Sequence, residues 1–121
     1  MSQFERMNPV AKELWLAALR SGEREQGKGY LNVSDKFCCL GVLCEVAIES
    51  GVVVEKEKDQ VGADHYYYYG GRSSYPPQAV YVWSGLGGLT TANGPDMKLS
   101  TLNDHDGKTF LEIADWIEEN L

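Results

Sequence analysis

The centre of the sequence reads Phe37-Cys38-Cys39-Leu40-Gly41-Val42-Leu43-Cys44 and continues into Glu45-Val46-Ala47-Ile48-Glu49-Ser50-Gly51. This stretch is apolar on nearly every side, because Glu45 and Glu49 are its only charged residues. A helix with so narrow a polar stripe is usually covered by the protein on several sides. The pattern therefore predicts a central buried helix over residues 36–50, closed by Gly51.

A helix near the start of the chain is predicted by the signals at its two ends. Asn8 is a suitable N-cap, Pro9 occupies the first helical position, and Gly22 follows the last turn. The apolar residues at helical spacing between these ends are Val10, Leu14, Trp15, Ala18 and Leu19. We expect them to form the face that packs on the core.

The C-terminal segment also predicts a helix. The sequence Thr109-Phe110-Leu111-Glu112 has the form of a capping box. The apolar face that follows it consists of Phe110, Ile113, Ala114, Ile117 and Leu121, and the acidic residues expected to face water are Glu112, Asp115, Glu118 and Glu119. A fourth helix is expected to start at Pro76-Pro77.

The remaining segments predict a small sheet. Residues 52–55 and 65–69 are rich in β-formers, and the polar connection 56–64 between them suggests a hairpin. Residues 30–33 would add an edge strand, and the glycine-rich residues 85–96 a loop. We expect an α+β fold in a single domain, residues 1–121, with about four helices around the cysteine helix and a small antiparallel sheet.

Composition excludes several classes of protein. With 121 residues, of which 43% are hydrophobic, the chain can bury a core and is not generally disordered. The net charge of −7 leaves no basic patch for binding a nucleic-acid duplex. No apolar run reaches the roughly 20 residues of a membrane helix. Three cysteines and an N-terminus without signal-peptide features lead us to expect a cytoplasmic protein.

The cysteines could form a metal site or belong to the core. A structural zinc site needs four ligands, whereas here one Cys-Cys-x4-Cys group accompanies two isolated histidines. Cys38 and Cys39 would also point about 100° apart on a helix. We expect no metal and no cofactor, and we expect the thiols to act as small buried hydrophobes.

The alternative role is that of a nucleophile at Cys38 or Cys39. Papain-like hydrolases place their cysteine at the start of a buried helix, where the helix dipole and a histidine lower the thiol pKa. His105 would be the base, and Asp104 or Asp106 would orient it. The order of the residues fits, but loop and capping signals surround His105 where such enzymes have a strand. A cysteine hydrolase therefore stays the alternative function.

Two glycine-rich segments, residues 20–30 and 69–75, could contact an anion. Glycine lets backbone N–H groups approach phosphate oxygens, and arginine adds a bidentate fork. Alternate tyrosines of a strand lie on opposite faces, so Tyr66 with Tyr68, or Tyr67 with Tyr69, could face outward. An exposed pair beside Arg72 would make a platform for stacking a base. The expected ligand contacts are Arg20, Arg24, Lys28, Tyr67, Tyr69, Arg72 and Ser73.

Five segments spread from Trp15 to the C-terminus form a distinctive set. They are Trp15-x-x-Ala18-Leu19-Arg20-Ser21-Gly22, Gln26-Gly27-Lys28-Gly29, the Phe37–Cys44 core, Leu102-Asn103-Asp104 and Gly107-Lys108-Thr109-Phe110-x-x-Ile113-Ala114-x-x-Ile117-Glu118. This set resembles a family of small proteins that recur in phage and prophage genomes. The resemblance implies a phage accessory protein made in the bacterial cytoplasm, but it carries over no site residue.

By analogy, many such phage proteins inhibit host defence, and some sequester nucleotide immune signals. The leading hypothesis is a counter-defence protein that binds a nucleotide-type ligand or a host defence protein and performs no catalysis. A homo-oligomer is a further expectation, because an aromatic surface can form a pocket between subunits. A third hypothesis is an acidic inhibitor of a host protein.

Overall fold

The computed structural model describes residues 4–87 and 94–121, which form five helices and a five-stranded sheet. The helices are α1 (Pro9–Arg20), α2 (Cys39–Glu49), α3 (Gln78–Ser84), α4 (Pro95–Asp104) and α5 (Phe110–Asn120). The strands are β1 (Glu25–Gln26), β2 (Asn32–Val33), β3 (Lys36–Phe37), β4 (Lys56–Val61) and β5 (Asp64–Tyr69). The α+β class is confirmed, with five helices where about four were expected.

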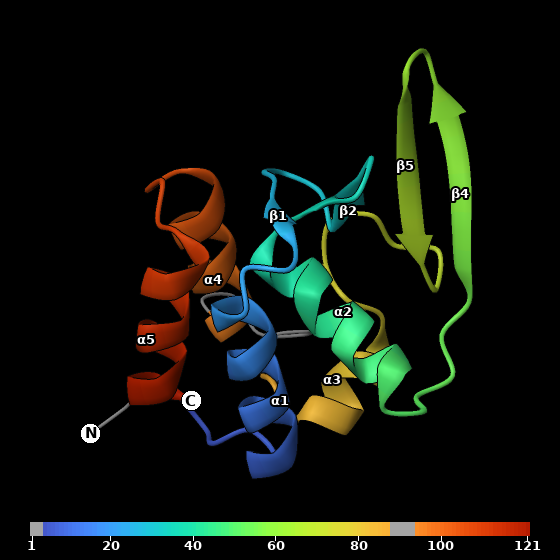
Figure 1. Cartoon of the computed structure of the whole chain (residues 1–121). Helices are drawn as coiled ribbons and strands as arrows, with labels where there is room; N and C mark the ends of the chain where they lie inside the picture. Colours follow the sequence, from blue (N-terminus) through green and yellow to red (C-terminus); the bar gives the residue numbers. More distant parts are fainter. Residues whose placement is uncertain (1–3, 88–93) are drawn as a thin grey trace.

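The sheet is mixed, not purely antiparallel as predicted. Its strand order is β1-β3-β2-β5-β4. The pairing of β1 with β3 is parallel, and the other three pairings are antiparallel. Strands β4 and β5 form a long hairpin that extends beyond the helices, as Figure 1 shows.

Helix α2 is the buried central helix, as predicted, and it packs against α1, α3 and α4. It begins at Cys39, three residues later than expected, because Lys36 and Phe37 pair with both β1 and β2 as strand β3. Gly41 lets α2 approach the chain before β2 closely. A Cβ atom there would lie 1.8 Å from the carbonyl oxygen of Leu31.

Helix α1 has the predicted cap but a different buried face. The Asn8 Oδ1 atom accepts hydrogen bonds from the N–H groups of Val10 (2.9 Å) and Ala11 (3.3 Å). The side that packs on the core carries Ala11, Trp15, Leu16 and Leu19. Val10 and Leu14, expected on that face, are 64% and 43% exposed. Periodicity places both residues near the apolar stripe, but the helix is turned toward the side that carries Trp15.

Helix α5 agrees with the prediction in detail. The Thr109 hydroxyl accepts from the N–H of Glu112 at 3.2 Å, and the Glu112 carboxylate accepts from the N–H of Thr109 at 3.1 Å. All five residues of its predicted apolar face are buried, and its four acidic residues are exposed. The helix packs along α1, next to which Figure 1 places it.

The hairpin is confirmed, but its first strand was misplaced. Residues 52–55 form no strand, and residues 56–61, predicted as the connection, form β4. Every residue of β4 is exposed, so charged side chains suit it despite their low β-propensity. Strand β2, predicted as an edge, lies between β3 and β5.

Helix α4 was not predicted. It begins at Pro95, inside the segment expected to be a loop, whose residues 88–93 lie outside the described part of the chain. Few apolar residues mark it, since Asp96 and Asn103 are also buried on its inner side. Asn103 and Asp104 are the last residues of this helix.

Candidate functional site

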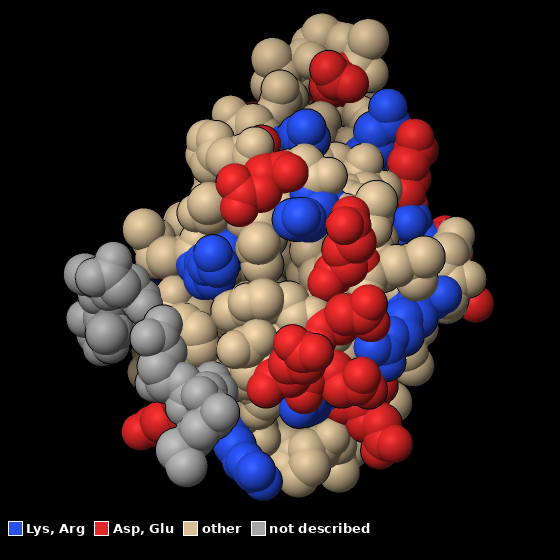
Figure 2. All heavy atoms as spheres, turned by 90° about the vertical axis from the view of Figure 1, so that its left-hand side faces the viewer, with Lys and Arg blue, Asp and Glu red and all other residues tan. Residues whose placement is uncertain are grey.

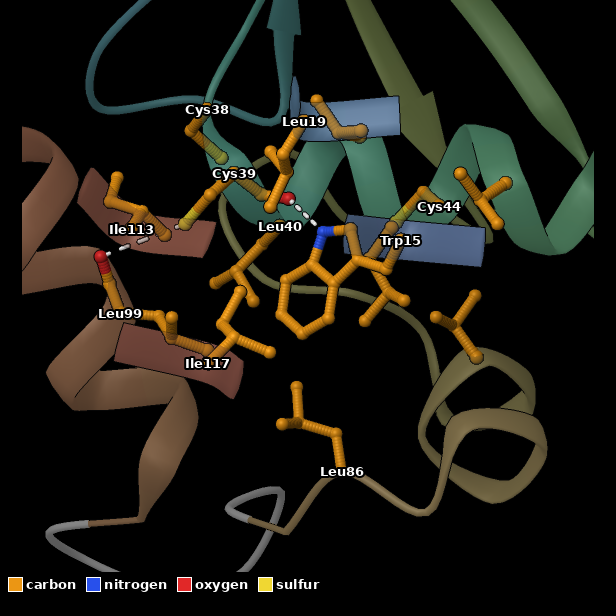
Figure 3. Close-up of a cluster of buried hydrophobic side chains, with 14 of the residues drawn as sticks. Trp15, Leu19, Cys38, Cys39, Leu40, Cys44, Leu86, Leu99, Ile113 and Ile117 are labelled. Carbon is orange, nitrogen blue, oxygen red and sulfur yellow. Dashed lines mark hydrogen bonds between the residues drawn. The ribbon is translucent and has the colours of Figure 1, made fainter. Parts of the chain in front are cut away.

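The three thiols lie in the core, where Figure 3 shows them among Trp15, Leu40, Leu99 and other apolar side chains. Cys38 is the N-cap residue of α2 and is 5% exposed, and Cys39 and Cys44 are fully buried. Burial raises the pKa of Cys38 to about 12 and raises the pKa values of Cys39 and Cys44 as well. The thiols are therefore protonated at neutral pH, which opposes a role as nucleophile.

His105 and Asp104, the other residues predicted for a cysteine hydrolase, have surroundings that do not support this role. His105 is exposed at the C-cap of α4. Asp104 Oδ1 accepts hydrogen bonds from the N–H of Gly29 (3.0 Å) and from Asn103 Nδ2 (2.8 Å). Burial is the main cause of the raised pKa of Cys38, and backbone hydrogen bonds partly oppose it. The negative charge of Asp104 raises this pKa further. Asp104 thus disfavours a thiolate and serves the fold.

Asn103 joins, directly or through Gln26, four of the five segments of the distinctive sequence set, and the sequence did not predict this role. It is completely buried, and its Oδ1 atom accepts from Gln26 Nε2 at 2.8 Å and from the N–H of Cys39 at 3.3 Å. Its Nδ2 atom donates to the carbonyl oxygen of Gly27 at 2.8 Å. Gln26 also donates to the carbonyl of Lys108 at 2.8 Å. These segments therefore meet to stabilise the fold.

The predicted basic ligand contacts are spread over different elements. Arg20 pairs with Asp115 (3.0 Å) and Glu118 (3.3 Å) of α5. Arg24 pairs with Glu49 of α2 at 3.2 Å. Lys28 is exposed on the loop after β1, and the exposed Arg72 follows β5. The structure does not bring these side chains together in one pocket.

Ser73, the remaining predicted contact on this segment, takes part in a backbone hydrogen bond. Its carbonyl oxygen accepts a hydrogen bond of 2.7 Å from the N–H of Leu31. Arg72 forms an antiparallel bridge with Tyr69, so both side chains project to the same side. That side is the inner face of the hairpin, the face turned toward α2, because Tyr69 bonds Glu45 of this helix.

Tyr67 and Tyr69 face inward. Tyr69 is fully buried, and its hydroxyl donates to Glu45 Oε2 at 2.5 Å and accepts from Asn32 Nδ2 at 3.1 Å. The Lys56 ammonium lies 2.7 Å from the same Glu45 oxygen and 5.1 Å from the ring centre of Tyr67. Burial, followed by the bond to Glu45, raises the pKa of Tyr69 above its ordinary value. Tyr69 anchors the hairpin to α2 and is closed to an external ligand.

Tyr66 and Tyr68 consequently face outward and are partly exposed. The ring of Tyr66 meets Tyr30 edge-on, with 5.3 Å between ring centres, and Tyr30 is 43% exposed. The register of the hairpin places Glu57 opposite Tyr68 and Asp59 opposite Tyr66. Residues opposite each other in an antiparallel pair share a face.

We call this surface the outer tyrosine face. It comprises Tyr30, Val61, Tyr66 and Tyr68 together with Glu57, Asp59 and Asp64. The two lysines of β4, Lys56 and Lys58, alternate with the acids and project to the inner face. The sequence predicted ligand contacts at Tyr67 and Tyr69, whereas the outward pair is Tyr66 and Tyr68; the acidic border of this pair depends on the register and could not be read from the sequence.

Acidic side chains also gather on α5. Figure 2, which shows the side of the molecule that carries α5, has a dense acidic region with basic side chains scattered around it. Its helix residues are Glu112, Asp115, Glu118 and Glu119, all exposed. Two of these acids pair with Arg20, so this region is partly neutralised within the fold.

Within residues 4–87 and 94–121, no group of three or more histidine, cysteine or acidic side chains is arranged to hold a metal ion. Across the same residues, no helix has the length and apolar character needed to cross a membrane.

Comparison with curated proteins and with solved structures gives no match. A family model does match residues 7–121, and the chain therefore belongs to the family described as a domain of unknown function, DUF8296.

Proposed function

We propose that this protein acts by binding a protein partner, without catalysis, and that the outer tyrosine face is its contact surface. The observation that supports this most directly is that partly exposed aromatic rings lie on a hairpin that projects beyond the helices. Tyrosine is enriched at protein interfaces, because its ring offers a large contact area with few rotatable bonds. The side chains with catalytic potential lie elsewhere: the thiols of Cys38 and Cys39 are buried, Asp104 is held by Gly29 and Asn103, and His105 is exposed at the end of α4.

A protein partner fits this face better than a nucleotide does. Stacking of a base on Tyr66 or Tyr68 would bring its phosphates toward Glu57 and Asp59, and like charges repel. Of the four basic residues expected to contact the ligand, Arg20 and Arg24 pair with acids on other elements, and Lys28 and Arg72 are exposed on separate segments and are not part of the outer tyrosine face. The geometry therefore favours the inhibitor hypothesis over nucleotide sequestration.

The phage resemblance suggests where such a partner would be found. A phage accessory protein of this type would act in the bacterial cytoplasm, and its target would be a host protein, for example a component of host defence. In this setting the acidic, aromatic hairpin would occupy the surface that the host protein needs for its own function. The analogy supplies the biological context, and the hairpin supplies the contact.

Two measurements test this proposal. First, the purified protein is incubated with a panel of cyclic nucleotides and ADP-ribose derivatives, and its melting temperature is recorded. We expect no shift, whereas a clear shift with release of the intact compound would replace a protein partner by a nucleotide.

Second, a partner isolated with the wild-type protein is purified and its affinity is measured by calorimetry. The double variant Tyr66→Ala with Tyr68→Ala should weaken binding at least tenfold, because central aromatic side chains carry much of the binding energy. The matched control, Leu111→Ala, removes an exposed side chain of α5 that is 59% exposed. Equal affinities of the double variant and the wild type would exclude the hairpin as the contact surface.

A further inference from the structure

We infer that the partner meets the outer tyrosine face with a basic segment rich in arginine, an inference that rests on the proposed function. The charged side chains that the hairpin itself places beside the tyrosines are all acidic, and Lys36, which shares this face through Val33, pairs with Glu25 at 3.8 Å. Glu57 and Asp59 border Tyr68 and Tyr66 on β4, and Asp64 closes the end of the face opposite Val61. A partner with basic side chains would be complementary to this arrangement.

These acids retain their charge for an external partner. Within the described part of the chain, no ion pair involves Glu57, Asp59 or Asp64. Asp64 accepts one hydrogen bond, of 3.2 Å, from the hydroxyl of Ser34, which leaves its negative charge in place. Other exposed acids, such as Asp115 and Glu49, pair with arginines of the same chain. The hairpin thus presents acids that the fold does not neutralise.

The rings give the preference for arginine. A guanidinium group stacks on an aromatic ring within about 6 Å of its centre while its N–H groups bind a carboxylate. This chain already makes such a contact internally, because the Arg24 guanidinium lies 5.8 Å from the centre of Phe37 and bonds Glu49 at 3.2 Å. On the outer face, each of Tyr66 and Tyr68 has a carboxylate directly across the strand pair. A row of arginines could repeat the same contact.

The inference predicts a strong dependence on salt. A chain of net charge −7 attracts a basic partner over a distance, and ions screen this attraction beyond about 8–10 Å at physiological concentrations. The net charge of the whole chain would attract a basic peptide to any acidic part of the surface, not only to the hairpin. A test must therefore separate the hairpin from the remaining acids of the protein.

The test uses a fluorescein-labelled peptide of eight arginines, with peptides of eight lysines and eight glutamates for comparison, and measures fluorescence anisotropy. The double variant Glu57→Lys with Asp59→Lys should weaken binding of the arginine peptide at least tenfold. The matched control, Glu13→Lys with Glu119→Lys, changes the net charge equally at exposed positions on α1 and α5 and should weaken it less than threefold. Equal losses in the two double variants would overturn the inference.

A second variant tests the rings. Tyr68→Leu keeps an apolar side chain but removes the aromatic face, and it should weaken binding of the arginine peptide about two- to fivefold while changing that of the lysine peptide less. Circular dichroism and thermal melting confirm that each variant is folded. No effect of Tyr68→Leu on either peptide would contradict the role of the ring.

The outcomes distinguish this inference from the proposed function. If an isolated partner loses affinity in the Tyr66→Ala, Tyr68→Ala variant but not in the Glu57→Lys, Asp59→Lys variant, the hairpin is the contact surface and the partner segment is not basic. If neither variant loses affinity for the partner, the proposed function itself fails.

Discussion

Replacing Gly41 by alanine tests the packing of α2 against the rest of the core. Two effects oppose each other. Alanine is favoured over glycine inside a helix by about 1 kcal/mol. The new Cβ, however, would lie 1.8 Å from the oxygen and 2.7 Å from the carbon of the Leu31 carbonyl group. Ordinary carbon–oxygen contacts are about 3.3 Å or longer, so one segment must move by about 1.5 Å.

The neighbouring backbone has little freedom to make this movement. Leu31 is fully buried, its N–H donates to Ser73 at 2.7 Å, and Asn32 after it belongs to β2. Overpacking of a well-packed core typically costs about 1–3 kcal/mol and occasionally more. Because the new Cβ would meet backbone atoms, we expect the cost of overpacking to lie in the upper part of this range and to exceed the gain of about 1 kcal/mol that alanine brings to the helix. The net loss in the free energy of unfolding should be about 2 kcal/mol or more.

The assay is urea unfolding followed by tryptophan fluorescence, since Trp15 is completely buried. The control is Lys98→Ala on the exposed side of α4, which should change the free energy of unfolding by less than about 0.5 kcal/mol. A Gly41→Ala variant as stable as the wild type, or more stable, would refute the reasoning. It would mean that helix preference outweighs the contact with Leu31.

Three further predictions concern the core and the caps. Burial raises the pKa of Cys38 from 9.0 to about 12, so its thiol stabilises the fold fully below pH 9 and loses this contribution as the pH rises toward 12. The free energy of unfolding in urea should therefore decrease less between pH 8 and pH 10.5 for Cys38→Ala than for the wild type. Asn103→Ala leaves its buried hydrogen-bond partners unsatisfied and should cost about 2–4 kcal/mol, whereas His105→Ala, at an exposed position, should cost less than about 0.5 kcal/mol in the same assay. Thr109→Ala removes the N-cap of α5 and should lower the free energy of unfolding by about 1 kcal/mol, with no loss expected if the capping box does not form.

The helices with strong end signals were predictable from the sequence. Asn8 before α1 and the Thr109–Glu112 box before α5 act locally, so neighbouring residues determine them. The burial of α2 also followed from its nearly continuous apolar surface. In contrast, α4 buries Asp96 and Asn103, whose hydrogen-bond partners come from distant segments, and local patterns cannot reveal such partners.

The candidate surface depended even more on distant contacts. The tyrosine run predicted two opposite faces, but the bond from Tyr69 to Glu45 of α2 decides which pair faces the helices. The acidic border arises because Glu57 and Asp59 pair with Tyr68 and Tyr66 across the hairpin. Since residues 56–61 were expected to be a connection between strands, nothing in the sequence placed these acids beside the rings.

The proposal that the outer tyrosine face binds a partner is tested most directly by site-specific photocrosslinking in host cells. A benzoylphenylalanine is placed at Tyr68, and in a separate variant at Leu111 of α5, which is 59% exposed. We predict one discrete cross-linked species from position 68, absent from position 111 and lost when Tyr66→Ala is added. Cross-links from position 111 alone, or from neither position, would contradict the proposal.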